Sequence, residues 1–83
     1  MSPVFHREKE YVFKVFSNEE ERMHLHIIKA ESEAKFWLEP QVELAENYGF
    51  SSKELATIQS IIENDTDGFK HKYAVHIGKR LND

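Results

Sequence analysis

Two short stretches in the first half of the chain alternate between polar and apolar side chains. Residues 24–28 read His-Leu-His-Ile-Ile and residues 34–38 read Ala-Lys-Phe-Trp-Leu. Because successive side chains of a strand point to opposite faces, the two histidines share one face, and Lys35 and Trp37 share a face in the same way. If the aliphatic faces form the core, these four polar and aromatic side chains lie together on the outer face of a sheet.

The flanking segments extend this pattern into an antiparallel meander. Residues 3–6 and 11–17 are rich in β-branched and aromatic side chains, which favours two strands joined by a polar turn over residues 7–10. A charged loop over residues 18–22 leads into the two alternating strands. Pro40 cannot donate a ladder hydrogen bond, so it ends the fourth strand. Residues 42–46 are either a brief fifth strand or the start of a loop.

A helical period replaces the strand period after residue 50. Ser51 is followed three positions later by Glu54, which is the capping-box pattern, and Phe50 and Leu55 are spaced for a hydrophobic staple. The apolar positions that follow fall on one helical stripe: Leu55, Ile58, Ile61 and Ile62. This stripe predicts a first helix over residues 51–63.

The segment over residues 69–77 fits both a helical period and a strand period. Phe69, Tyr73 and His76 suit one face of a helix that Asp65 would cap, whereas residues 73, 75 and 77 also alternate as in a strand. We favour a second helix over residues 65–78, with Gly78 as the residue that follows its end. The whole pattern predicts a single α+β domain over residues 1–83, in which a four- or five-stranded antiparallel sheet packs against one or two C-terminal helices.

Composition narrows the class of protein. Eighty-three residues make one small domain, and 40% hydrophobic with 31% charged residues is a composition that folds. The absence of cysteine excludes disulfides, thiolate metal sites and cysteine nucleophiles. A net charge of −4 argues against a protein that coats nucleic acid. We find neither a signal-peptide pattern nor an apolar run long enough for a membrane span, so we expect a cytoplasmic protein that makes no membrane contact.

The candidate chemistry is metal-independent cleavage of RNA. Two histidines one residue apart on a strand lie ~6.5–7 Å apart, and histidine can take or give a proton near neutral pH. His24 and His26 would then act as base and acid, and Lys35 would offset the charge on the phosphate. Trp37 would stack on a base, and Lys14, if it shares this face, would bind a neighbouring phosphate.

Other interpretations of the same residues stay open. The histidines can simply fill a half-exposed strand face, and Trp37 can pack beneath a helix or at an interface. A zinc-like ion held by the histidine pair with Glu33 or Glu39 is a further alternative, but no third histidine lies at a motif spacing, so we predict no metal and no cofactor. The domain can also be a non-catalytic interaction module that extends its sheet with a partner, and the acidic residues 39–46 would suit a basic one.

The chain also resembles a small bacterial family known as domain of unknown function 4160. The similarity lies in residues 33–40, residues 42–51 with Glu54 and Leu55, residues 16–19, and the His24-Leu25-His26 triplet, and it covers roughly residues 3–63. The chain departs from the family at residues 21–23, where a proline-rich approach is usual, and at residues 71–76, where the last helix usually ends in aromatic residues.

The resemblance implies a function but assigns no catalytic residues. Members of that family are commonly encoded beside a second small protein, which implies a two-gene toxin–antitoxin module. The expected function is therefore a toxin-like component that acts on RNA or translation and is neutralised by its small cognate partner. The alternative is a non-catalytic domain that serves as an inhibitor, an adaptor or half of an obligate complex.

Overall fold

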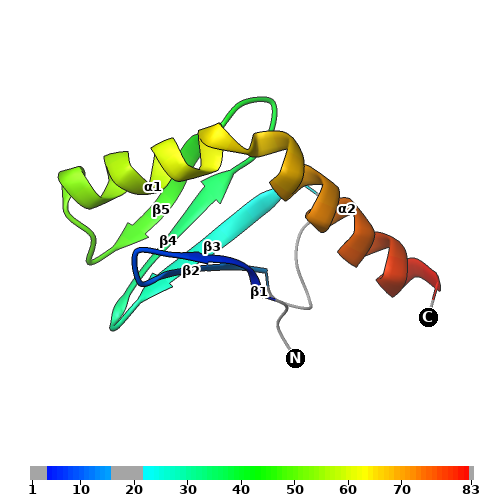
Figure 1. The fold of residues 1–83 in the computed structure, drawn as a ribbon, viewed down its shortest axis with the longest axis horizontal. Coiled ribbons are helices and arrows are strands. Elements are labelled where there is room, and N and C mark those ends of the chain that lie inside the picture. Colours follow the sequence, from blue (N-terminus) through cyan, green and yellow to red (C-terminus); the bar gives the residue numbers. More distant parts are fainter. Residues whose placement is uncertain (1–3, 16–21, 83) are drawn as a thin grey trace.

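The computed structural model describes residues 4–15 and 22–82, with the backbone alone over 77–82. One five-stranded sheet is followed by two helices, and the strands lie side by side in chain order with every neighbouring pair antiparallel (Figure 1). This architecture confirms the predicted α+β class. The elements are β1 (Val4–Glu8), β2 (Tyr11–Lys14), β3 (His24–Lys29), β4 (Ser32–Trp37), β5 (Glu43–Tyr48), α1 (Ser52–Asn64) and α2 (Thr66–Asn82).

The ends of the first and fifth strands differ from the prediction. β1 continues to Glu8, so the first turn shrinks to Lys9 and Glu10, which have φ angles of 51° and 71°. Two successive positive φ values are typical of the tight turn whose twist matches a hairpin. The fifth strand exists and is displaced toward the C-terminus relative to residues 42–46. Residues 16–17 of the predicted second strand, and residues 18–21 of the loop after it, lie outside the described residues.

The core lies between one face of the sheet and the helices. The side chains that we expected to point inward do so, and each is fully buried: Leu25, Ile27, Phe36 and Leu38. α1 lies across this face in Figure 1 and buries Ile58, Ile61 and Ile62. The period-two pattern of the strands and the helical stripe therefore meet in a single apolar layer.

The capping box predicted for α1 is present. The backbone N–H of Glu54 donates to Ser51 Oγ at 3.1 Å, and the backbone N–H of Ser51 donates to Glu54 Oε1 at 3.0 Å. Phe50 is buried before this cap, where its ring lies 5.8 Å from that of Tyr11. The two reciprocal hydrogen bonds satisfy N–H groups that a helix leaves without partners.

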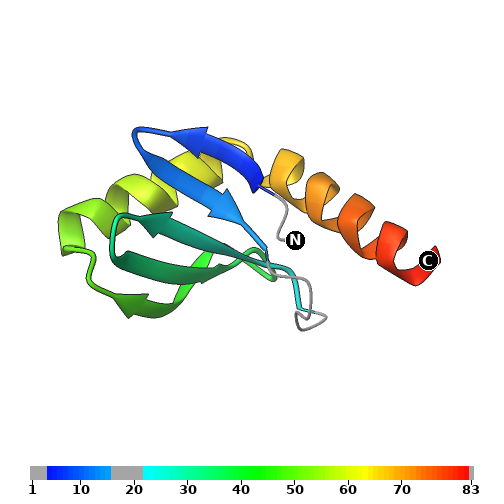
Figure 2. The same cartoon turned by 90° about the horizontal axis from the view of Figure 1, so that it is seen from below.

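The ambiguous last segment is helical. α2 starts directly after Asp65 and buries Phe69 and Tyr73. Our prediction that the helix ends before Gly78 is wrong, because α2 continues to Asn82 and extends beyond the sheet (Figure 2). A glycine inside a helix costs about 1 kcal/mol relative to alanine, which is too little to stop a helix that continues into good helix formers.

Gly49 joins β5 to α1 under a close steric constraint. Its φ is +103°, and a Cβ at this position would lie 2.6 Å from Ser32 Oγ and 3.2 Å from Ser32 Cβ. We expect Gly49→Ala to lower the free energy of unfolding by about 1–3 kcal/mol in urea denaturation. Adding Ser32→Gly should restore part of the loss by removing the clash. Glu31→Ala, an exposed change beside Ser32, serves as the control, and an equal loss in that variant would contradict the steric explanation.

Candidate functional site

The sheet register brings all five predicted site residues to one face. Lys14 of β2 pairs with His26 of β3, and His26 pairs with Lys35 of β4, so the three lie in one row across the sheet. His24 pairs with Trp37 in the next row. Directly paired residues share a face, so the residues that alternation placed together are neighbours in the fold. We call this group the histidine face.

His24 is sealed inside the protein. Its exposed fraction is 0%, and its ring lies 5.6 Å from that of Tyr73 of α2, 5.3 Å from that of His26 and 5.9 Å from that of Trp37. The expectation that both imidazoles point into solvent is therefore wrong for His24. The cause is tertiary, because Tyr73 reaches the first residue of β3 from 49 positions further along the chain.

Hydrogen bonding defines which nitrogen of His24 carries the proton. Nδ1 lies 2.7 Å from the backbone carbonyl oxygen of Arg22. A carbonyl oxygen can only accept, so Nδ1 carries the hydrogen and donates it. In the neutral ring Nε2 is then the atom that can take a proton, and Nε2 is buried. A general base must come within hydrogen-bond reach of the hydroxyl that it deprotonates, which Nε2 does not do for a substrate arriving from solvent.

His26 is only slightly more accessible. Its side chain is 13% exposed, its Nδ1 lies 3.3 Å from Glu33 Oε2, and its Nε2 is buried. The carboxylate of Glu33 holds the ring from the neighbouring strand β4. The two imidazoles are therefore adjacent, as the alternation predicted, while both Nε2 atoms face the protein rather than an open substrate site.

The tryptophan of the histidine face is already in contact with two cations. The Arg22 guanidinium carbon lies 4.0 Å from the Trp37 ring centroid, and Lys35 Nζ lies 4.6 Å from it. Lys35 is itself buried, and Arg22 Nε donates to the Glu39 backbone oxygen at 3.0 Å. Cation–π contacts of this kind stabilise the packing of the ring. Stacking on a base would require these contacts to be exchanged, so the geometry favours packing for Trp37.

The carboxylates considered as metal ligands have other roles. Glu33 contacts His26, and Glu39 Oε1 accepts from the backbone N–H of Met23 at 3.0 Å. Among the described residues, no group of three or more histidine, aspartate or glutamate side chains is placed to hold a metal ion.

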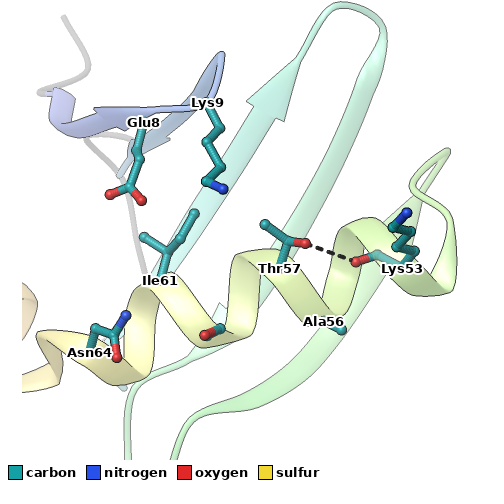
Figure 3. A pocket seen from close by; sticks show the side chains of 8 residues that line it. Glu8, Lys9, Lys53, Ala56, Thr57, Ile61 and Asn64 are labelled. Carbon is teal, nitrogen blue, oxygen red and sulfur yellow. Dashed lines mark hydrogen bonds between the residues drawn. The ribbon is translucent and has the colours of Figure 1, made fainter.

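A polar groove lies elsewhere, between the β1–β2 turn and α1 (Figure 3). Glu8 at the end of β1 and Lys9 in the turn extend toward the helix, where Thr57 Oγ1 donates to the backbone oxygen of Lys53 at 3.1 Å. None of the predicted site residues lines this groove. Its walls contain no histidine and are formed by Glu8, Lys9, Lys53, Ala56, Thr57, Ser60, Ile61 and Asn64.

The most open element of the structure is β5, at one end of the strand order. Five of its six residues are exposed, and Leu44 and Tyr48 are 40% and 64% exposed. Within the described chain, only β4 pairs with it. The sequence indicated an acidic stretch over residues 39–46 but did not identify β5 as the open edge of the sheet. The available signal was the same acidic run, since charged side chains are seldom buried in a core.

The other edge, β1, is partly occupied. Lys72 Nζ of α2 donates to the Phe5 backbone oxygen at 2.7 Å, and the pairing of β1 with β2 is irregular between Val4 and His6. The pairing of β5 with β4 is also irregular, between Lys35 and Phe36, so the difference between the two edges lies in Lys72, which occupies a backbone acceptor of β1. The two edges of the sheet are therefore unequal, and β5 is the accessible one.

Burial predicts that the two histidines differ in their structural importance. His24→Ala removes a fully buried ring, so we expect it to lower the free energy of unfolding by about 2–5 kcal/mol in urea denaturation. His26→Ala, which truncates a partly exposed ring, should cost roughly 1 kcal/mol. Equal losses in the two variants would contradict the sealed position of His24.

The pKa of Tyr48 depends on a contact with Glu46 in the same strand, β5. Its hydroxyl donates to Glu46 Oε1 at 3.0 Å, and this hydrogen bond, together with the charge of Glu46, raises the pKa of Tyr48 above 10.0. A raised pKa means that the stabilising contact is complete below pH 10 and is lost as the pH rises through the raised value. Glu46→Ala should lower the pKa of Tyr48 in an ultraviolet titration. Glu43→Ala is the control and should leave it unchanged.

Comparison with known proteins places the chain in a family. No curated protein and no solved structure matches it. No helix in the described part of the chain is long and apolar enough to cross a membrane. The model of the family called Domain of unknown function (DUF4160) matches residues 11–74, a span that takes in β2 to β5, α1 and the buried part of α2. The chain therefore belongs to the DUF4160 family.

Proposed function

We propose that this protein is a non-catalytic protein-interaction domain, one half of a two-protein complex, and that it binds through the open edge of β5. The observation that carries the proposal is the exposure of β5, whose residues are solvent-accessible at five of six positions on a strand that pairs on one side only within the described chain. A strand of this kind has backbone groups along its outer edge that another chain can bind.

The state of the histidine face supports binding over catalysis. Catalysis by a histidine pair requires ring nitrogens that reach the substrate. The Nε2 atoms of His24 and His26 are buried, and Nδ1 of His24 is committed to the Arg22 carbonyl. Lys35, which would stabilise the phosphate, is buried beside Trp37. The face therefore has the character of a packed polar layer.

The partner in this proposal is a small protein encoded beside this one. The family resemblance implies such a neighbour, and a binding role is compatible with a toxin-like component that acts by docking to its target. In that arrangement the partner neutralises the protein by covering β5.

A second candidate function is action on RNA, favoured by one specific observation. Lys14, His26 and Lys35 lie in one row across three strands, so two cationic side chains flank an imidazole. This candidate requires the row to open to a substrate. Growth arrest on expression, compared with folded His26→Ala and Lys35→Ala variants, tests it. Arrest that survives in both variants would contradict it.

The proposed interaction is tested by co-expression with the protein encoded beside this one. We expect a one-to-one complex in size-exclusion chromatography, with slower hydrogen exchange of the β5 amides than in the free chain. Leu44→Asp places a charge on the exposed strand and should weaken binding at least about tenfold, which corresponds to about 1.4 kcal/mol. The matched control is Val75→Asp on α2, where the valine is exposed by 45%, close to the 40% of Leu44.

Two results would overturn the proposal. One is failure of the two proteins to associate. The other is an equal effect of Leu44→Asp and Val75→Asp on affinity, since β5 would then contribute no more than any exposed apolar residue.

A further inference from the structure

Given the proposed function, on which this inference rests, the chemistry of β5 specifies what it binds. We infer that the partner supplies a short extended segment with alternating basic and apolar side chains, which pairs with β5 as a sixth strand. Three features of β5 favour this ligand: its open backbone edge, the negative charge on its outer face and the apolar residue on its opposite face.

The backbone edge favours an extended ligand. β5 is six residues long, and within the described residues its only strand neighbour is β4. At the opposite end of the sheet, Lys72 already donates to a carbonyl of β1. Main-chain hydrogen bonds supply the affinity when a strand is added to a sheet, and side chains at alternate positions supply the specificity.

The outer face of β5 is acidic. Glu43 pairs with Trp37 and Glu46 pairs with Lys35, so both glutamates lie on the side of the histidine face, and both are exposed. Opposite charges directly across a pair of strands stabilise the pairing, and like charges destabilise it. A lysine or arginine on the added strand therefore fits beside each glutamate.

The same charges disfavour a second copy of this chain as the occupant. Antiparallel pairing of β5 with β5 of another molecule would bring the acidic residues of the two strands, Glu43 and Glu46, onto one face. The repulsion between like charges on adjacent strands opposes that dimer. The glutamates thus discourage self-association and select a partner of opposite charge.

The face toward the helices is apolar at Leu44. This residue pairs with Phe36 of the core, yet 40% of it is exposed. An apolar side chain on the added strand would cover it and extend the core by one residue. The pairing of β4 with β5 is irregular between Lys35 and Phe36. Such a bulge twists the strand locally, so the edge suits a short segment better than a long flat one.

The test uses two synthetic eight-residue peptides, one alternating lysine with valine and one alternating glutamate with valine. Each is titrated into the full chain while backbone amide shifts are followed by NMR. We expect the lysine peptide to shift the amides of β5, with an affinity that falls as salt is added. The glutamate peptide should not bind.

Charge reversal provides the matched variants. The double variant Glu43→Lys with Glu46→Lys should bind the lysine peptide with an affinity at least about tenfold lower. It should also bind the glutamate peptide. The control is Glu63→Lys, at an exposed position of α1. It makes the same glutamate-to-lysine change away from β5 and should have little effect on the affinity for either peptide. The same variants are then measured against the natural partner.

The outcomes separate this inference from the proposed function. If the partner protects β5 but charge reversal leaves its affinity unchanged, or if the lysine peptide does not bind, the basic segment is wrong and the interaction proposal stands. If the chain alone forms a dimer with protected β5 amides, the occupant is a second copy and the inference fails. If the partner does not bind at all, the proposed function itself fails.

Discussion

Burial of one face of β3 and β4 against the helices is the interaction on which the rest of the structure depends. Leu25 and Ile27 from β3 and Phe36 from β4 are fully buried, as are Ile58 and Ile62 of α1. In a chain of this size a single apolar layer provides most of the available stabilisation. Once that layer is formed, the alternate side chains of the same strands must point to the opposite face of the sheet. The residues of the histidine face lie there for this reason.

The histidine face shows how polar groups are accommodated when a small sheet buries part of its second side. His24 is buried, but its Nδ1 donates to a carbonyl, and Lys35 lies against the ring of Trp37. A buried polar group is tolerated when it keeps a hydrogen bond or a charge partner. These contacts stabilise the face and also occupy the atoms that catalysis would require. Residue types that suggest chemistry in the sequence therefore serve packing in the fold.

The functional asymmetry of the molecule lies in its two sheet edges. Lys72 of α2 donates to a backbone carbonyl of β1, whereas β5 has exposed side chains on both faces. An exposed edge promotes uncontrolled association unless charge limits it. Glu43 and Glu46 provide that charge, and the same residues give the edge a preference for a basic partner. Protection against aggregation and selection of a ligand are thus one physical property.

Local patterns in the sequence determined the secondary structure and the sides of the strands. The capping residues Ser51 and Glu54 act within one turn, and the alternation of β3 and β4 acts between adjacent residues, so both could be predicted without the fold. The same alternation placed His26 and Lys35 on one face, which the register confirms. The extension of α2 past Gly78 was not predictable, because a modest local preference of glycine is outweighed by the residues around it.

Only the tertiary structure decided which of these residues reach solvent. His24 and His26 lie on the same face by alternation, yet their exposure differs. His24 packs against Tyr73 and is fully buried, whereas the side chain of His26 remains 13% exposed. β5 has the composition of a solvated segment, and its position at the end of the sheet is what makes it an edge. Exposure depends on which distant element packs against a side chain, and contacts between residues far apart in sequence leave no periodic signal along the chain.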